Sequence, residues 1–340
     1  MSGTRRILIV GPSWAGDMVM AQTLFTAIKA RQPDAEIDVL APGWSRPLLK
    51  HMPEVHQMID MPLGHGRLGL SERWRMGRAL RANGYDQAIV LPNSLKSALI
   101  PLFADIPKRT GWVGEMRYGL LNDIRRLDKQ RLPMMVQRFV ALALPSGEEA
   151  LPEIEPPRLT VRPEEVEKAL EAMGLQREKG PILALCPGAE FGPAKRWPEP
   201  FYAEVARYYI DQGWQVWLFG SEKDACVCAE INSQSRSSCV DMSGQTSLQQ
   251  AVALLSLSDA VISNDSGLMH VAAALQRPLV AVYGSTDPGF TPPLNSKARI
   301  VRLGLECSPC FKRQCPLGHL NCLRQLTPSQ VTETLDRLLA

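Results

Sequence analysis

The densest group of chemically competent residues lies in the second half of the chain, where an apolar segment runs into Asn264-Asp265-Ser266-Gly267-Leu268-Met269-His270. Ser266 is a favourable N-cap for the helix expected next, and Gly267 lets a ligand approach its first turn. The free N–H groups and the positive end of the helix dipole suit a diphosphate. His270, one turn further on, would face the same anion. An ordinary capped helix with a core histidine is the alternative, and the local pattern leaves both open.

Two further loops of the same half carry charge at the ends of predicted strands. The first contains Gly188 and Ala189 and then Lys195 and Arg196 ahead of a helix. A lysine here can neutralise charge on a departing phosphate. The second loop contains Glu222, which can accept hydrogen bonds from ribose hydroxyls. Each of these residues alone is more often an ordinary surface residue, but together they predict a binding edge.

In the first half, the loop after the first predicted strand reads Gly11-Pro12-Ser13-Trp14-Ala15-Gly16-Asp17-Met18. It has neither G-x-G-x-x-G nor the Lys-Ser/Thr of a P-loop, which disfavours a dinucleotide dehydrogenase and a P-loop kinase. On local sequence, Asp17 is best interpreted as a helix N-cap. Its functional interpretation is a general base that takes a proton from a substrate hydroxyl.

Short apolar runs that alternate with helical patterns must position these loops. Continuous apolar strands separated by helices indicate parallel sheets covered on both faces. Ligands of such sheets bind beyond the carboxyl ends of the strands, so two facing domains would form a cleft. Strands are predicted at Arg6–Val10, Glu36–Leu40, Gln57–Ile59, Gln87–Leu91 and Lys108–Trp112, and then at Ile182–Cys186, Gln215–Phe219, Val240–Met242, Ala260–Ser263 and Leu279–Tyr283.

The predicted fold class is therefore α/β, with two Rossmann-like domains whose parallel sheets face each other. A length of 340 residues also favours two domains. Prolines cluster between residues 145 and 162, which is typical of a linker. We expect an N-terminal domain at residues 1–160, a C-terminal domain at 161–325 and a final helix at 326–340.

The charge distribution limits the classes of binding partner. The net charge is only +3, yet residues 64–131 carry 13 Lys and Arg against 6 Asp and Glu, which suggests an anionic partner or an ordinary solvated surface. Nucleic acid is disfavoured because no binding motif appears. No apolar run approaches the roughly 18 residues of a membrane span. The first apolar run is too short for a signal peptide, so we expect a cytoplasmic protein.

Eight cysteines include the cluster Cys307-x2-Cys310-x4-Cys315-x6-Cys322, with His319 inside it. In a cytoplasmic chain such a cluster suggests zinc more readily than disulfides. The spacing lacks the paired C-x2-C symmetry of common zinc motifs. Reduced thiols that pack a loop are therefore the favoured interpretation, and structural zinc is the alternative.

Four segments in order resemble the ADP-heptose:lipopolysaccharide heptosyltransferases, inverting glycosyltransferases with the two-Rossmann GT-B fold. The resemblance extends from residue 7 to about residue 290. Two more segments, Leu91–Ser97 and Arg109–Trp112, look most like the type II members, which add the second inner-core heptose. The four segments are Gly11–Asp17, Lys195–Glu199, Asp265–His270 and Val282–Gly289.

The resemblance implies that the C-terminal domain binds ADP-heptose and the N-terminal domain binds heptosyl-Kdo2-lipid A. Asp17 matches the general base, and Lys195 with the Ser266–Gly267 turn matches the groups that receive the diphosphate. Glu222 matches the ribose contact. The remaining predicted donor contacts are Gly188, Ala189, Asp265 and His270. At Gly188-Ala189 some relatives carry hydroxyl residues, and backbone N–H groups can substitute there.

For the acceptor, the predicted contacts are Trp14, Asn93, Ser94, Lys96 and Arg117. The acceptor carries phosphates and carboxylates, which gives the basic stretch a reason, and the same stretch can dock on an anionic membrane surface. No Asp-x-Asp pair occurs that would hold a divalent metal, so we expect metal-independent transfer and no cofactor. The alternatives are a nucleotide-sugar epimerase of related fold, a heptosyltransferase acting at another core position, and a non-catalytic metal-bearing scaffold.

Overall fold

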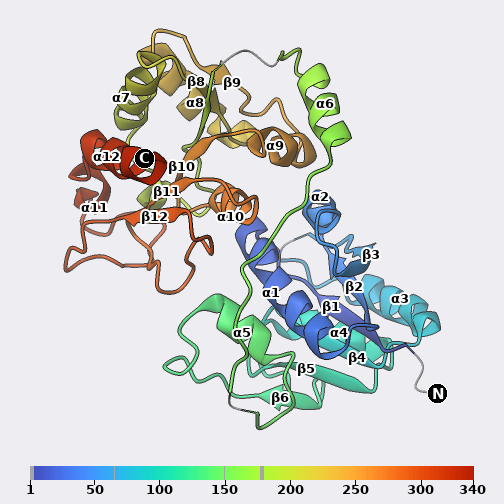
Figure 1. Cartoon of the computed structure of the whole chain (residues 1–340). Helices are drawn as coiled ribbons and strands as arrows, with labels where there is room; N and C mark the ends of the chain where they lie inside the picture. Colours follow the sequence, from blue (N-terminus) through green and yellow to red (C-terminus); the bar gives the residue numbers. More distant parts are fainter. Residues whose placement is uncertain (1–3, 65, 149, 177–179) are drawn as a thin grey trace. The chain divides into compact units, whose positions relative to one another are not determined.

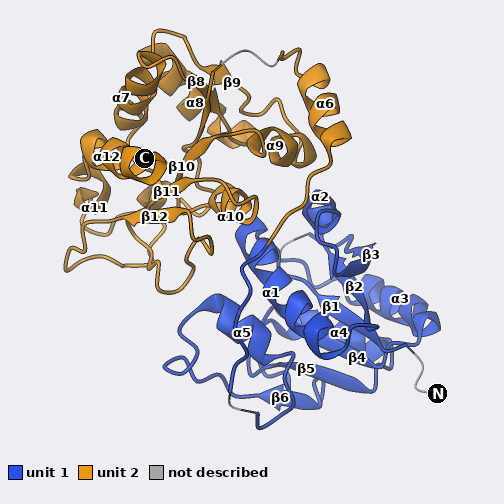
Figure 2. Cartoon of the chain, in the orientation of Figure 1, with its two compact units in different colours: residues 1–157 blue, residues 158–340 orange. Residues whose placement is uncertain are grey.

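The computed structural model describes residues 4–64, 66–148, 150–176 and 180–340. The chain forms two compact units, residues 1–157 and 158–340 (Figure 2). The division therefore falls within the proline-rich segment, three residues before the predicted boundary. Among the described residues, no helix combines the length and the apolar composition that crossing a bilayer requires.

The first unit is built on one parallel sheet with the strand order β3-β2-β1-β4-β5-β6 (Figure 1). Its strands are β1 (Arg6–Val10), β2 (Glu36–Ala41), β3 (Val55–Asp60), β4 (Gln87–Val90), β5 (Lys108–Trp112) and β6 (Asp123–Arg125). Its helices are α1 (Ala15–Arg31), α2 (Arg46–Leu49), α3 (Leu70–Leu80), α4 (Leu95–Phe103) and α5 (Met135–Ala141).

The central strands of this sheet are buried on both faces, as continuous apolar runs predict. Ile7, Leu8 and Ile9 of β1 are each at most 1% exposed. Helices α3 and α4 pack against each other, and α1 packs against α5. Helix α1 is buried from Met18 to Phe25, because it lies directly after β1 and runs back over the sheet.

The second unit repeats the plan with the parallel order β12-β11-β10-β7-β8-β9. Its strands are β7 (Ile182–Cys186), β8 (Gln215–Leu218), β9 (Val240–Asp241), β10 (Ala260–Asn264), β11 (Leu279–Val282) and β12 (Ala298–Val301). Its helices are α6 (Pro163–Ala172), α7 (Glu199–Ile210), α8 (Ala225–Gln234), α9 (Leu248–Leu255), α10 (Gly267–Ala274), α11 (Asn321–Arg324) and α12 (Pro328–Leu339).

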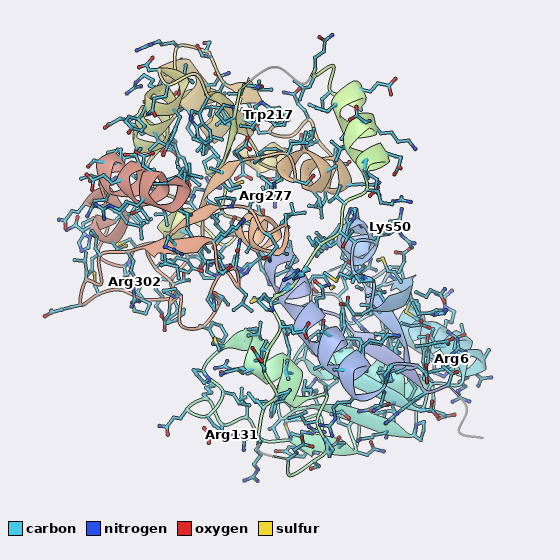
Figure 3. The ribbon with its side chains drawn as sticks, viewed as in Figure 1. Arg6, Lys50, Arg131, Trp217, Arg277 and Arg302 are labelled. Carbon is cyan, nitrogen blue, oxygen red and sulfur yellow. The ribbon has the colours of Figure 1, made fainter. Side chains whose placement is uncertain are left out.

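Large aromatic side chains fill the core of the second unit. Trp197 meets Tyr202 edge to face with ring centroids 5.0 Å apart, and the Trp197 indole N–H donates to the Leu326 carbonyl over 2.9 Å. Trp217 on β8 is also fully buried (Figure 3). Helix α12 packs on this core, and the Tyr209 hydroxyl donates to Asp336 over 2.8 Å. The final helix is thus part of the second unit rather than a separate element.

Both sheets place a topological switch point at their first strand. In the first unit the chain leaves β1 toward β2 and β3 and later returns to β4 on the other side of β1. In the second unit it leaves β7 toward β8 and β9 and returns to β10. Such points open a crevice at the carboxyl ends of the two central strands, where ligands of this architecture bind.

Candidate active site

At the switch point of the second unit, the loops after β7 and β10 meet through an ion pair. Lys195 Nζ lies 2.6 Å from Asp265 Oδ2, and the side chains are 14% and 5% exposed. The Thr286 hydroxyl, from the loop after β11, donates to the same carboxylate oxygen. Two residues seventy positions apart therefore form one charged centre at the edge predicted for the donor.

Helix α10 begins beside this centre. The Ser266 hydroxyl accepts a hydrogen bond from the Met269 N–H over 3.4 Å, so the predicted N-cap is confirmed. Ser266 and Gly267 are only partly buried. Asp265 directly precedes Ser266, so its partner Lys195 lies beside the start of α10. A helix N-terminus with a lysine beside it is a combination that binds phosphate groups.

His270 lies in the first turn and a half of α10 and is buried. Burial lowers the pKa of His270 to about 4, Asp265 raises it, and Lys195 lowers it further. The imidazole is therefore neutral near pH 7. It belongs to the same electrostatic group as the ion pair, but it contributes no positive charge to an anion.

Asp224, which sequence analysis missed, connects the loops after β7 and β8, because Arg196 Nη2 of the first loop lies 3.6 Å from Asp224 Oδ1. This carboxylate accepts from the N–H and the hydroxyl of Ser221 over 3.0 and 2.7 Å. A Cβ at Gly188 would lie 2.5 Å from Asp224 Cγ, so only glycine allows this approach. The neighbouring Ala189 is buried, whereas Glu222 is exposed at the same edge of the sheet.

Asn264, the last residue of β10, fixes the loop that carries Lys195. Its side-chain oxygen accepts from the Trp197 N–H and the Tyr202 hydroxyl, each over 3.1 Å. Its amide nitrogen donates to the Pro187 carbonyl over 2.6 Å. In the sequence, the signal for this role is an asparagine at the end of a mostly apolar strand.

In the first unit, the loop after β1 leads into α1. Trp14 occupies the N-cap position and is 41% exposed, without a side-chain capping bond. Asp17 is the third residue of the helix and is partly buried. The interpretation of Asp17 as the N-cap is therefore wrong. Its carboxylate lies in the first turn, at the carboxyl end of the sheet, where the helix dipole stabilises its charge.

The loop after β4 carries the other predicted acceptor contacts. Asn93 is exposed, and Ser94 occupies the N-cap position of α4 without a side-chain capping bond. Lys96 is the second residue of that helix and is partly exposed. A cation in the first turn opposes the helix dipole, so its position favours an anionic ligand.

Arg117 does not offer the predicted acceptor contact, because it is fully buried. Its guanidinium donates to the carbonyls of Pro92 and Trp112 and to the Asn93 side chain over 3.3 Å. Because its guanidinium donates to main-chain oxygens, Arg117 holds the Asn93 loop in place from inside the unit. Arg117 is therefore a positioning residue rather than a contact of the acceptor.

Other arginines of the basic stretch are used in the same way. Arg109 donates to the carbonyls of Leu120 and Ile106 over 2.7 and 2.6 Å. Arg73 is buried and donates to the Leu68 carbonyl. A part of the predicted basic surface is therefore internal structure, and the anionic partner must be met by the exposed remainder.

The model of glycosyltransferase family 9 (heptosyltransferase) matches residues 73–321. The chain belongs to this family. It is 52% identical to the lipopolysaccharide heptosyltransferase 2 of Salmonella typhimurium (strain LT2), over 98% of this chain and 99% of that protein. It is 51% identical to the corresponding Escherichia coli (strain K12) protein, over 98% of both chains.

The three-dimensional structure of this family 9 glycosyltransferase gives the same result. It matches the E. coli ADP-heptose lps heptosyltransferase II with a TM-score of 0.88 and 48% identity over 98% of each chain. The predicted family and the GT-B fold are thereby confirmed. Membership among enzymes that transfer sugars removes the support for an epimerase and for a non-catalytic scaffold.

Proposed function

We propose that this glycosyltransferase moves heptose from ADP-heptose to heptosyl-Kdo2-lipid A, adding the second heptose of the inner core with inversion at the anomeric carbon. The observation that carries the proposal is the Lys195–Asp265 ion pair beside the N-terminus of α10, at the switch point of the second unit. This arrangement suits a diphosphate, and the full-length relatives are heptosyltransferases of type 2.

The leaving ADP is stabilised by charge that is already in place. As the bond from the anomeric carbon to the phosphate oxygen breaks, its electrons pass to ADP, and the Lys195 ammonium and the α10 N–H groups take up the charge. Asp265 holds Lys195 in position at 2.6 Å before the donor arrives. These groups replace a divalent cation, which makes the transfer independent of added metal.

Asp17 is the base on the acceptor side. The acceptor oxygen attacks the anomeric carbon from the face opposite ADP, and its proton passes to the Asp17 carboxylate. The sugar carries oxocarbenium character in the transition state. The bond to ADP therefore breaks ahead of proton transfer to Asp17. Trp14, exposed beside Asp17, offers a flat face to the acceptor sugar.

The remaining donor contacts follow from exposure. Glu222 is exposed at the end of β8, and its carboxylate accepts from the ribose hydroxyls. Gly188 and Ala189 have no polar side chain, so they would meet the phosphates through their backbone N–H groups. His270 stays neutral and serves as a hydrogen-bonding neighbour of the diphosphate rather than a cation.

Docking on the cytoplasmic face of an anionic membrane brings the enzyme to its lipid-linked acceptor. Helix α3 and the preceding residues expose apolar side chains, with Leu68, Leu70 and Trp74 at 55%, 54% and 49%. Exposed Arg67, Arg75 and Arg78 alternate with them along the same segment, and Arg78 lies 5.3 Å from the Trp74 ring centroid. Apolar and aromatic residues flanked by arginines are typical of a helix that lies in a membrane interface.

Binding to vesicles tests the membrane contact. We expect the enzyme to sediment with vesicles that contain phosphatidylserine, and less so as salt is raised, because surface charge is screened. Replacement of Trp74 and Arg75 by serine should weaken sedimentation and leave transfer to a detergent-dispersed acceptor unchanged. Binding that ignores both lipid charge and salt would contradict the proposal.

Transfer from ADP-heptose to heptosyl-Kdo2-lipid A tests the proposed activity. The wild type should release ADP only when the acceptor is present, whereas turnover of ADP-heptose without acceptor would indicate an epimerase. Asp17→Asn should lose about 100-fold or more of the rate. Asp34→Asn, an exposed aspartate in a turn of the same unit, is the matched control. Full activity of Asp17→Asn would remove the proposed base.

A further inference from the structure

The four clustered cysteines line a single cavity of the second unit. The cavity has a volume of about 20 Å3, which is enough for one water molecule or one metal ion. Its walls include Cys307, Cys310, Cys315 and Cys322, together with His319 and Ser285. None of the four is in a disulfide. Residues 302–320 form no helix or strand apart from turns, so little besides the cavity orders this segment.

A buried polar group faces this cavity without a partner. Ser285 is 1% exposed, and within the described ranges its hydroxyl makes no hydrogen bond. Buried hydroxyls are normally satisfied, so an unpaired one in a cavity wall indicates a missing occupant. The serine is independent evidence, because it belongs to the loop after β11 and not to the cysteine segment.

The four sulfurs lie in one small region. Main-chain N–H groups of residues 317–320 hydrogen-bond the Cys315 sulfur. Cys322 is close enough to the other three cysteines to interact with them electrostatically. A cation among the sulfurs would hold this irregular segment together.

We propose that Cys307, Cys310, Cys315 and Cys322 bind one thiophilic divalent metal ion, zinc or ferrous iron, with tetrahedral sulfur coordination. Soft thiolate ligands in a set of four select these ions. His319 is not a ligand through Nδ1, because that atom accepts from the Asn321 N–H over 3.0 Å. In the part of the chain that the structure describes, no three His, Cys, Asp or Glu side chains are placed so that they could hold a metal ion without moving. Binding therefore has to draw the four sulfurs together from the cavity wall, and the segment that carries the first three of them has no helix or strand to resist this.

The metal ion would position the donor site without taking part in the reaction. The cysteine segment bonds directly to the loops after β7 and β11. The Arg313 carbonyl accepts from the Ala194 N–H over 3.1 Å, and the Phe311 N–H donates to the Ser285 carbonyl over 2.7 Å. The Arg313 guanidinium lies 5.6 Å from the Phe191 ring centroid, and Lys195 Nζ lies 5.0 Å from the same ring. Metal that orders this segment therefore orders the loop that carries Lys195.

Metal analysis of the full chain tests the proposal, after purification under reducing, oxygen-free conditions without a metal-affinity tag. We expect about one zinc or iron per chain, and metal analysis identifies which. In the metal-free chain, added Co2+ should give the intense absorption of tetrahedral cobalt thiolate. Cys315→Ser should lose the metal, whereas Cys226→Ser, an exposed cysteine of α8, should retain it.

Two results would overturn the proposal. One is a metal-free wild type whose four thiols all react with a thiol reagent and which gives no cobalt thiolate absorption. The other is a disulfide between any two of the four cysteines in the freshly purified chain. Since Co2+ titration of the wild type needs no variant, misfolding of Cys315→Ser would leave the test intact. None of these measurements depends on transfer activity.

Discussion

Replacement of Lys195 by methionine should lower both folding stability and catalytic rate, and the two losses have separate origins. Lys195 Nζ lies 2.6 Å from Asp265 Oδ2, with 14% and 5% of the side chains exposed. Methionine keeps the length of the side chain and removes the charge and the donors. The Asp265 carboxylate then retains the Thr286 hydroxyl but no cation.

The loss of stability arises from the carboxylate that is left unpaired. Removal of one partner from a buried pair costs about 3–5 kcal/mol. At roughly 2–4 °C per kcal/mol for a unit of this size, the unfolding temperature of the second unit should fall by about 10 °C. The loss of rate arises in the transition state, where one missing preorganised donor costs about 10²–10³ in kcat.

The double variant Lys195→Met/Asp265→Asn separates the two effects. With both charges absent, no unpaired carboxylate remains, so stability should recover to within about 1–2 kcal/mol of the wild type. The rate should stay low, because the ammonium that faces ADP is still missing. Lys223→Met is the control: its pair with Glu190 is 72% and 53% exposed, and such surface pairs contribute under about 1 kcal/mol.

Three measurements check this reasoning. Urea and thermal unfolding give the stability, initial rates of ADP release give kcat and KM, and calorimetry gives the affinity for ADP. The expected pattern is a double variant that is stable and slow. A Lys195→Met enzyme with the wild-type kcat/KM, or a double variant that regains the wild-type rate, would refute the role of Lys195 in stabilising ADP.

Three further predictions concern the pH, the backbone and the metal. The folded-state pKa of His270 is about 4, below its unfolded value, so the unfolded chain binds the extra proton between pH 6.5 and 4. The free energy of unfolding therefore falls as the pH falls through that window, by up to about 3 kcal/mol. His270→Gln should flatten this slope in urea titrations, and an unchanged slope would contradict the prediction. Gly188→Ala places a Cβ 2.5 Å from the Asp224 carboxyl carbon and should weaken ADP binding at least tenfold in calorimetry, whereas Gly64→Ala, with nothing within 4 Å, should leave it unchanged. Transfer should proceed in Mg2+-free buffer with brief EDTA treatment, and a rate that depends on added Mg2+ would show that the metal-independent mechanism is wrong.

The strands show how far local pattern reaches. All ten predicted strands overlap observed ones. The central strands were predictable because a strand buried on both faces is a continuous apolar run. The two strands that were missed, β6 and β12, lie at sheet edges. Their sequences, Asp-Ile-Arg and Ala-Arg-Ile-Val, carry charges and stay partly exposed, so neither looks like a buried run. The other two edge strands, β3 and β9, were predicted. An edge strand without an apolar run depends on a neighbour that local sequence does not reveal.

The site residues also divide into those set by local sequence and those set by tertiary contacts. The Ser266 cap was predictable because capping depends on residues within one turn. The Asp17 cap was wrong by three positions, because the helix starts where the chain leaves β1 and not where a capping side chain is available. Asn264 and Asp224 were missed because each acts on a loop contributed by a different strand.

By itself, the sequence determined that the chain folds into two parallel α/β units with charged and glycine-rich loops at their strand ends, since these depend on periodicity and turn chemistry. Only the tertiary structure decided which charges are available to a ligand. Lys195 meets Asp265 because β7 and β10 are neighbours across a switch point, and Arg117 turns inward to main-chain carbonyls. The physical reason is that a charge binds the nearest oxygen, and the order of strands in the sheet decides which oxygen is nearest.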